Sequence, residues 1–427
     1  MWLFLHQHKR LFEIIIVILS AIAFAYLTFN RANRLDKILF EYGNEYGGNF
    51  IVRTSDIWFD GDLPKMKYMM LQRTFAGHAI TSEHPFLSTL LFFPTYILQN
   101  VFKISPWNAI SVYSTSIAFI FTILLYVTIR YISGRMLDSI LFTILGSSSA
   151  AATFWLPVPE AFSIGALSIL LVLIISNRSR LKKYPLITHL FINLISLSVT
   201  VTNWVMGILS SILHLNWRRA ILIIATAFVL ASILWVVEKQ AFPEAQFFLT
   251  GSSRTSEFLI KPSFTRVIEV TRTVFFHSMI MPEIVIQNKL GNTDYLSVQK
   301  SPLMYETVSG FGALILWMIL LSGGIFGAYY YYKSQKEGFL LLAGSFLFML
   351  GMHIFMGEEI FLYAMHFLPF LIILSSLSTL TRYRRFFLAL TSILLVVLII
   401  NNIGQFQIAN EIVDNMAEVA RKLNFPE

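Results

Sequence analysis

Long apolar runs, separated by short polar stretches, recur along most of the chain. Runs of this length are typical of membrane-spanning helices, because about 20 apolar residues are needed to cross the hydrocarbon core of a bilayer. The pattern predicts an all-α integral membrane protein with about eleven transmembrane helices, in a single polytopic domain over residues 1–427. The predicted spans are 11–29, 109–130, 137–155, 161–176, 185–201, 203–216, 220–237, 308–332, 338–355, 360–378 and 386–403.

Basic residues mark every second connection between these spans, and the remaining short turns carry glutamates instead. Because Lys and Arg concentrate in cytoplasmic loops, this alternation predicts a cytoplasmic N-terminus. The formal net charge of +8 is accounted for by these loops, so no nucleic-acid partner is expected. The basic connections hold Lys9 and Arg10; Arg130 and Arg135; Arg178 to Lys183; Arg218 and Arg219; Lys333 and Lys336; and Arg382 to Arg385.

Two long connections fall on the extracytoplasmic side, at residues 30–108 and 238–307. The charge alternation holds only if the apolar run at 85–103 does not cross the membrane. That run contains Pro94 and several aromatic residues, which favours a juxtamembrane helix lying at the headgroup level. A site is therefore expected in these outer loops.

The amino-acid composition excludes some classes of protein and of site. The chain is 56% hydrophobic and 13% charged, which is more apolar than a soluble domain. It contains no cysteine, so disulfides, thiol nucleophiles and thiolate metal sites are excluded.

The first outer loop places Asp56, Asp60 and Asp62 within seven residues, followed by Lys65. A carboxylate beside an apolar surface can serve as a general base. The alternative is a solvated turn, since Asp, Gly and Pro dominate turns for conformational reasons.

Other candidate residues lie near the remaining outer turns. Glu160 follows Pro159 where two spans meet, which suits either a functional carboxylate or one that stabilises a helix N-terminus. Asn203 interrupts an apolar stretch, while Glu359 and Tyr363 lie at the last outer turn. In the large loop, Arg266 and Arg272 stand among Phe residues and could bind a lipid-linked phosphate; solvated basic residues are the alternative.

The order of three motifs resembles the glycosyltransferase C superfamily. These motifs are Asp60-Gly61-Asp62 with Leu63-Pro64-Lys65, then His78 to His84-Pro85-Phe86-Leu87, then Pro159-Glu160-Ala161-Phe162. The spacing is closest to a poorly characterised bacterial branch, over residues 1 to about 235. Lys65 replaces an Arg of that pattern, and Phe86 replaces its second Pro or Leu.

The resemblance implies a glycosyltransferase of the bacterial inner membrane, acting in glycan biosynthesis of the cell envelope. It would move a sugar from a polyprenyl-phosphate carrier to an extracytoplasmic glycan, lipid or protein acceptor. The resemblance ranks Asp62 first as general base, then Asp60, then Asp56, with Glu160 as a further catalytic residue. Lys65, Arg266 and Arg272 are expected to bind the donor phosphate, and the expected substrate-binding residues are His78, His84, Asn203, Glu359 and Tyr363.

Two questions stay open at this point. No cofactor or protein metal site is expected, although a divalent cation shared by Asp60 and Asp62 is an alternative seen in some members of the superfamily. The rival function is a transporter or flippase for a polyprenyl-linked or small hydrophilic substrate. An enzyme of another type, such as a glycan polymerase, is the third alternative. A transporter should carry ionisable residues at mid-membrane depth between repeated halves, whereas the acidic residues here gather at the outer loops.

Overall fold

The structure is a computed structural model that describes residues 2–44, 57–176, 186–248, 250, 259–289, 293–303, 305 and 307–424. The described first half is entirely helical. Its elements are α1 (Trp2–Asn44), α3 (Leu63–Leu71), η1 (Ala76–Ser82), α4 (Leu87–Asn100), α5 (Pro106–Ser133), α6 (Met136–Ser147), α7 (Ala150–Trp155), α8 (Ala161–Ser176), α9 (Leu186–Val199), η3 (Val201–Asn203), α10 (Trp204–His214) and α11 (Trp217–Ala241).

The second half adds a short antiparallel hairpin to further helices. In this hairpin Val285 lies opposite Ser297 at one end, and Lys289 lies opposite Thr293 at the other. Its elements are α13 (Phe264–Arg272), the π-helical turn η4 (Thr273–His277), β1 (Val285–Lys289), β2 (Thr293–Ser297), α14 (Val308–Ser334), α15 (Lys336–Phe355), η5 (Ile360–Tyr363), α16 (Ala364–Ser376), η6 (Leu377–Leu380) and α17 (Arg384–Asn424).

Seven of the described helical segments are long and apolar enough to cross a membrane. This confirms the predicted class, an all-α membrane protein. Three further apolar helices, α6, α8 and α9, are shorter. The seven long segments are Leu11–Leu35, Pro106–Ser133, Trp217–Ala241, Val308–Ser334, Lys336–Phe355, Ile360–Leu380 and Arg384–Met416.

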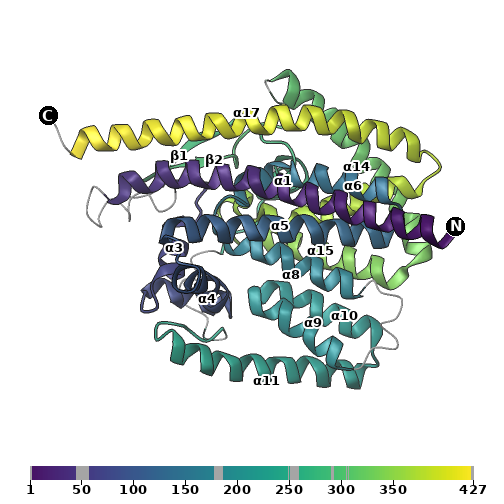
Figure 1. Cartoon of the computed structure of the whole chain (residues 1–427), viewed down its shortest axis with the longest axis horizontal. Coiled ribbons are helices and arrows are strands. Elements are labelled where there is room, and N and C mark those ends of the chain that lie inside the picture. Colours follow the sequence, from purple (N-terminus) through teal and green to yellow (C-terminus); the bar gives the residue numbers. More distant parts are fainter. Residues whose placement is uncertain are drawn as a thin grey trace.

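The long helices run side by side along one direction (Figure 1). The N-terminus lies at one end of this bundle, and α3, α4 and the hairpin gather toward the opposite end. Because α1 and α5 pack together and run in opposite senses, the segment between them starts and finishes at that same opposite end. This end therefore collects residues from both long connections.

Several helix bounds differ from those predicted. α1 and α17 contain 43 and 41 residues, well beyond the predicted spans 11–29 and 386–403, because the polar segments that follow the apolar cores continue the helix. The predicted span 137–155 is broken into α6 and α7. Ser149 causes the break, because its side chain caps α7 by accepting the N–H of Ala152 at 3.2 Å.

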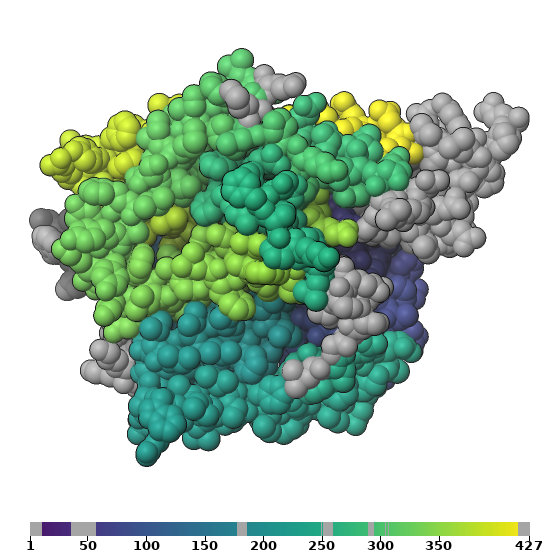
Figure 2. Space-filling view, turned by 180° about the vertical axis from the view of Figure 1, so that it is seen from behind, coloured from purple at the N-terminus to yellow at the C-terminus, as the bar shows by residue number. Residues whose placement is uncertain are grey.

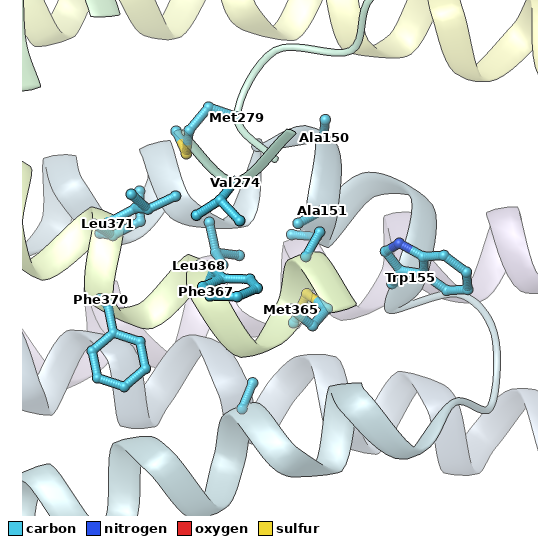
Figure 3. Packing of buried hydrophobic residues seen from close by; sticks show 14 of the residues in the cluster. Ala150, Ala151, Trp155, Val274, Met279, Met365, Phe367, Leu368, Phe370 and Leu371 are labelled. Carbon is cyan, nitrogen blue, oxygen red and sulfur yellow. The ribbon is translucent and has the colours of Figure 1, made fainter. Parts of the chain in front are cut away.

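The second long connection is folded into the bundle, with part of it in the core. Val274 and Met279 lie over Leu368 of α16 and beside Ala150 of α7 (Figure 3). The first amide of α7, at Ala150, donates to the carbonyl of Met279 at 2.9 Å. Residues of this loop therefore satisfy the free N–H groups at the start of α7, which would be costly to leave unpaired when buried.

Close packing of α14 against η6 gives a test of this arrangement. A Cβ on Gly327 would lie 2.0 Å from the carbonyl oxygen of Leu377, whereas a Cβ on Gly312 of the same helix would meet nothing nearer than 3.9 Å. We expect Gly327→Ala to destabilise the fold by about 1–3 kcal/mol through overpacking. Gly312→Ala should instead be stabilising by about 0.5–1 kcal/mol, as usual for alanine in a helix.

The two variants are compared by thermal unfolding of purified protein in detergent micelles. Equal stability of Gly327→Ala and Gly312→Ala would contradict the close approach of α14 and η6.

Candidate functional site

The first long connection, between α1 and α5, enters the described structure as a tight turn at residues 57–61. Phe59 and Asp60 have positive φ angles of 51° and 59°. This left-handed backbone is uncommon outside glycine, and each such residue costs about 1–3 kcal/mol. Gly61 follows, where a Cβ would lie only 3.1 Å from the ring of Trp155. The turn is strained, so contacts elsewhere in the fold must hold it.

Aromatic side chains from distant parts of the chain supply those contacts. The buried ring of Phe59 packs edge-on against Phe154, Trp155 and Phe361, with ring centroids 5.6, 6.2 and 5.1 Å away. Trp58 donates its indole N–H to the carbonyl of Phe154 at 3.2 Å, and Trp155 donates to the carbonyl of Phe361 at 2.8 Å. Edge-to-face ring pairs contribute about 0.5–1.5 kcal/mol each beyond burial, which offsets the backbone strain.

Asp62 immediately precedes α3 and carries the accessible carboxylate of the turn. Its side chain is 45% exposed, and its Oδ2 lies 3.0 Å from the Nζ of Lys65. Pro64 in the first turn of α3 restricts the backbone there and gives up an N–H that a helix start leaves free anyway. Asp62 is thus a proton acceptor with a cation one helical turn away.

Glu160 lies in the short connection between α7 and α8 and is 3% exposed. Its Oε1 accepts the N–H of Ala161 at 2.9 Å, as expected for a carboxylate at a helix N-terminus. Burial raises the pKa of Glu160 to about 8, and the nearby charge of Asp62 acts in the same direction, while Lys65 opposes it. At neutral pH this carboxyl group is therefore mainly protonated and can donate a hydrogen bond.

Glu359, just before η5, is a second buried carboxyl group among the predicted site residues. Its Oε2 accepts a short hydrogen bond from the hydroxyl of Ser297 at the end of β2. Burial raises the pKa of Glu359 to about 8, and the charge of Asp60 adds to the effect. The turn is joined to the same strand, because Leu296 donates its N–H to the carbonyl of Ile57 at 2.8 Å.

The two predicted histidines have different surroundings. The Nδ1 of His84 lies 3.0 Å from the carbonyl oxygen of Val199, so the ring must donate there and Nε2 is left as an acceptor. Burial lowers the pKa of His84 to about 4, which keeps the ring neutral. Both nitrogens of His78 are used, by the carbonyl of Gln72 and the hydroxyl of Ser88, each at 2.8 Å. His78 therefore fixes the fold of η1 and α4.

Tyr363 and Asn203 have different surroundings: Tyr363 packs among aromatic rings, whereas Asn203 binds the backbone. The ring of Tyr363 packs edge-on to Phe162 at 4.6 Å, and Phe162 also contacts the rings of His366 at 4.9 Å and His84 at 5.7 Å. Asn203 is fully buried in η3 and donates to the carbonyl of Gly165 at 3.2 Å. Asn203 thus ties the break between α9 and α10 to α8, as the interrupted apolar stretch suggested.

Arg266 is 5% exposed and is committed to backbone carbonyls at the end of α15. Its Nη1 donates to Glu358 at 3.1 Å, and its Nη2 donates to His353 at 3.1 Å, to Met356 at 3.3 Å and to Gly357. A guanidinium at this position satisfies carbonyls that a helix end leaves free.

Arg272 also contacts the backbone, through a 2.6 Å hydrogen bond from Nη2 to the carbonyl of Gln299. The side chain of Gln299 links three elements, since it donates to Glu269 at 3.0 Å and accepts the N–H of Ile360 at 3.1 Å. Arg272 therefore supports the strand end that faces Glu359.

The candidate site is the cluster of predicted residues that the structure brings together by contact or electrostatic interaction. His78, Asn203 and Arg272 are hydrogen-bonded to other parts of the fold, and Asp56 lies outside the described residues. Arg266 interacts electrostatically with Glu359 and Tyr363, but its guanidinium is bound to backbone carbonyls. The cluster members are Asp60, Asp62, Lys65, His84, Glu160, Glu359 and Tyr363.

Sequence reasoning missed Ser297, Gln299 and Phe162. The first two are neutral polar residues. Nothing in their sequence surroundings indicates that Ser297 would meet Glu359 and Gln299 would meet Ile360, each some 60 positions away. Phe162 was noted only as part of a motif. Among the described residues, no group of three or more His, Asp or Glu side chains is arranged to hold a metal ion.

Comparison with known proteins gives no neighbour for this chain: no family model matches it, and neither does any curated protein or solved structure. The fold and site define an all-α membrane protein with a carboxyl-rich cluster at one end of its helical bundle.

The two raised pKa values predict how stability depends on pH. A carboxyl group that titrates near 8 when folded and near 4.5 when unfolded retains its proton in the native state. The stability it contributes is fully present below pH 4.5 and is lost as the pH rises through 8. The loss per group is at most about 1.4 kcal/mol for each pH unit.

We therefore expect the melting temperature in detergent to fall between pH 5 and 8, and Glu160→Gln to flatten that slope. Glu411→Gln, at an exposed position of α17, is the matched control and should leave the slope unchanged. An identical slope in Glu160→Gln and the parent protein would contradict a protonated Glu160.

Proposed function

We propose that this protein is a membrane glycosyltransferase that moves a sugar from a polyprenyl-phosphate carrier to an acceptor hydroxyl outside the cytoplasm. The observation that supports it most is the meeting of Asp62, Lys65 and Glu160 at one end of the bundle. An exposed carboxylate, a cation and a protonated carboxyl group are the parts that such a transfer needs.

Under this proposal all eleven predicted segments cross the bilayer and the carboxyl-rich end faces outward. Helix α4 lies along the outer interface, because a crossing at this point would place the basic loops that follow on the outer side. The opposite end is cytoplasmic, and two ion pairs lie there: Arg130 with Glu13 and Arg384 with Asp138.

The transfer itself follows from the positions of three groups. The acceptor hydroxyl gives its proton to Asp62 while its oxygen forms a bond to the anomeric carbon. The bond from that carbon to the carrier phosphate breaks, and its electron pair stays on the phosphate oxygen. Lys65 stabilises the departing phosphate, and the protonated carboxyl group of Glu160 donates a hydrogen bond to the bound substrate. Because the hydroxyl attacks opposite the leaving group, the configuration of the anomeric carbon is inverted.

A transporter remains the alternative of another class. It requires ionisable groups along a path through the bundle, whereas the site carboxylates lie at loop and helix ends. An assay of carrier-dependent sugar transfer by purified protein distinguishes the two, because a transporter gives no glycosylated product.

General-base catalysis by Asp62 predicts a large and specific loss on substitution. Asp62→Asn keeps the shape of the side chain and removes the proton acceptor, so turnover should fall by about 10²- to 10⁴-fold. The measurement is sugar transfer from a polyprenyl-phosphate donor in proteoliposomes. Asp294→Asn, at an exposed position of the hairpin, is the matched control and should keep normal turnover.

Asp60→Asn is measured in parallel. Near-normal turnover in Asp62→Asn with a large loss in Asp60→Asn would assign the base to Asp60, and normal turnover in both would refute this loop as its source.

Donor binding through Lys65 predicts a change in affinity. A charged hydrogen bond to phosphate is worth about 1.5–3 kcal/mol, so Lys65→Gln should weaken donor binding by roughly 10- to 100-fold. The control is Lys300→Gln, because Lys300 is exposed in the loop after β2. Equal donor affinities in the two variants, measured by equilibrium binding, would remove Lys65 from the site.

A further inference from the structure

Helix α13 (Phe264–Arg272) has its polar and apolar faces reversed relative to a helix on a water-facing surface. Phe264, Val267 and Ile268 form one stripe at the spacing i, i+3 and i+4, and they are 81%, 38% and 46% exposed. Arg266 and Val270 point the other way and are 5% and 1% exposed. A large apolar stripe facing outward, above a buried arginine, calls for an apolar surrounding.

The buried face explains why the helix cannot simply rotate. The guanidinium of Arg266 donates to four carbonyls at the end of α15, and the Ser263 hydroxyl accepts the Arg266 N–H at 3.1 Å and caps the helix. Turning the stripe inward would expose those carbonyls and bring Arg266 to the surface, at the cost of the hydrogen bonds. The outward direction of Phe264 is thus fixed by the polar contacts.

The stripe continues an apolar surface that belongs to a membrane-spanning helix. Just before α13, Leu259 is 60% exposed and forms an isolated bridge with Met356, and Ile260 donates its N–H to Phe355 at 2.9 Å. On α15 itself, Leu347 and Phe355 are 63% and 50% exposed. Figure 2 shows the face of the molecule on which this part of the chain packs beside α15 and α16.

We propose that α13 is an interfacial helix whose stripe of Phe264, Val267 and Ile268 inserts among the acyl chains of the bilayer leaflet at the carboxyl-rich end. The partner is bulk membrane lipid. Short amphipathic helices with aromatic and aliphatic residues on one face lie in this way at the headgroup boundary. A second copy of the chain is a poorer match, because a nine-residue helix, about 14 Å long, offers far less than the roughly 1,200 Å² of a stable interface.

The insertion has a consequence for the candidate site. Through Arg266, α13 holds the turn at 356–358, which leads directly into Glu359. Helix α13 contacts lipid on one face and the carbonyls of this turn on the other. The position of the Glu359 carboxyl group is therefore linked to the membrane surface through α13. The inference about α13 does not depend on the proposed enzymatic activity.

The test uses the absence of cysteine from the chain, so that a single introduced cysteine carries a nitroxide label without background. Ile268→Cys places the label on the stripe, and Thr265→Cys, exposed on the flank of the same helix, is the matched control. Both are reconstituted in phosphatidylcholine and phosphatidylglycerol nanodiscs, and collisions with oxygen and with a water-soluble nickel chelate are measured. We expect the ratio of oxygen to nickel accessibility to be severalfold higher at 268 than at 265.

Nickel accessibility at 268 equal to that at 265 would overturn the proposal, because the stripe would then face water. Low accessibility to both reagents, with a spin–spin interaction between copies, would overturn it in favour of a dimer contact. Val267→Cys repeats the measurement on the same stripe if Ile268→Cys is not recovered as folded protein.

Discussion

The placement of Asp60 and Asp62 in the candidate site depends on the burial of one ring, that of Phe59. A left-handed Phe followed by a left-handed Asp is unfavourable on its own, by about 1–3 kcal/mol for each residue. Burying a Phe side chain gains about 1.5–3 kcal/mol, and the ring contacts with α7 and η5 add to it. The turn can therefore persist, and it brings the charge of Asp60 near Glu359 and the charge of Asp62 near Glu160.

The two buried carboxyl groups of the candidate site give it an unusual electrostatic character. Glu160 and Glu359 each lie at the start of a helix, where backbone N–H groups accommodate a carboxyl oxygen, yet burial outweighs that help and favours the protonated form. Each is beside a more exposed aspartate of the turn. The site therefore holds two pairs, Glu359 with Asp60 and Glu160 with Asp62, and each pair places a neutral donor next to an acceptor. Such an arrangement suits a ligand with several hydroxyl groups, because a hydroxyl both donates and accepts.

The sequence predicted the helices far better than it predicted the contacts between loops. Apolar runs and their breaks, such as the one at Asn203, are local signals, and they located the helices to within a few residues except where polar segments extended α1 and α17. The motif order also placed Asp62 and Glu160 in one expected site, and the charge of Asp62 lies near enough to raise the pKa of Glu160. In contrast, the hydrogen bond from Ser297 to Glu359 joins distant segments through a hairpin whose residues have no distinctive pattern. Arg266 was expected at a phosphate because its burial against carbonyls cannot be read from its neighbours in sequence.

The commitment of Arg266 to carbonyls changes where positive charge is available for a donor phosphate. Lys65 is the cation in direct contact with Asp62, at 3.0 Å, and both side chains are partly exposed. Under the proposed function, a phosphate entering beside Lys65 competes with Asp62 for the same ammonium group. An ammonium is a point charge on a flexible stem, so it can turn toward the phosphate without moving the backbone, which a guanidinium bound to four carbonyls cannot do. Donor binding then weakens the ion pair and leaves the carboxylate of Asp62 free to accept the proton of the acceptor hydroxyl, which orders the two substrates with the donor first.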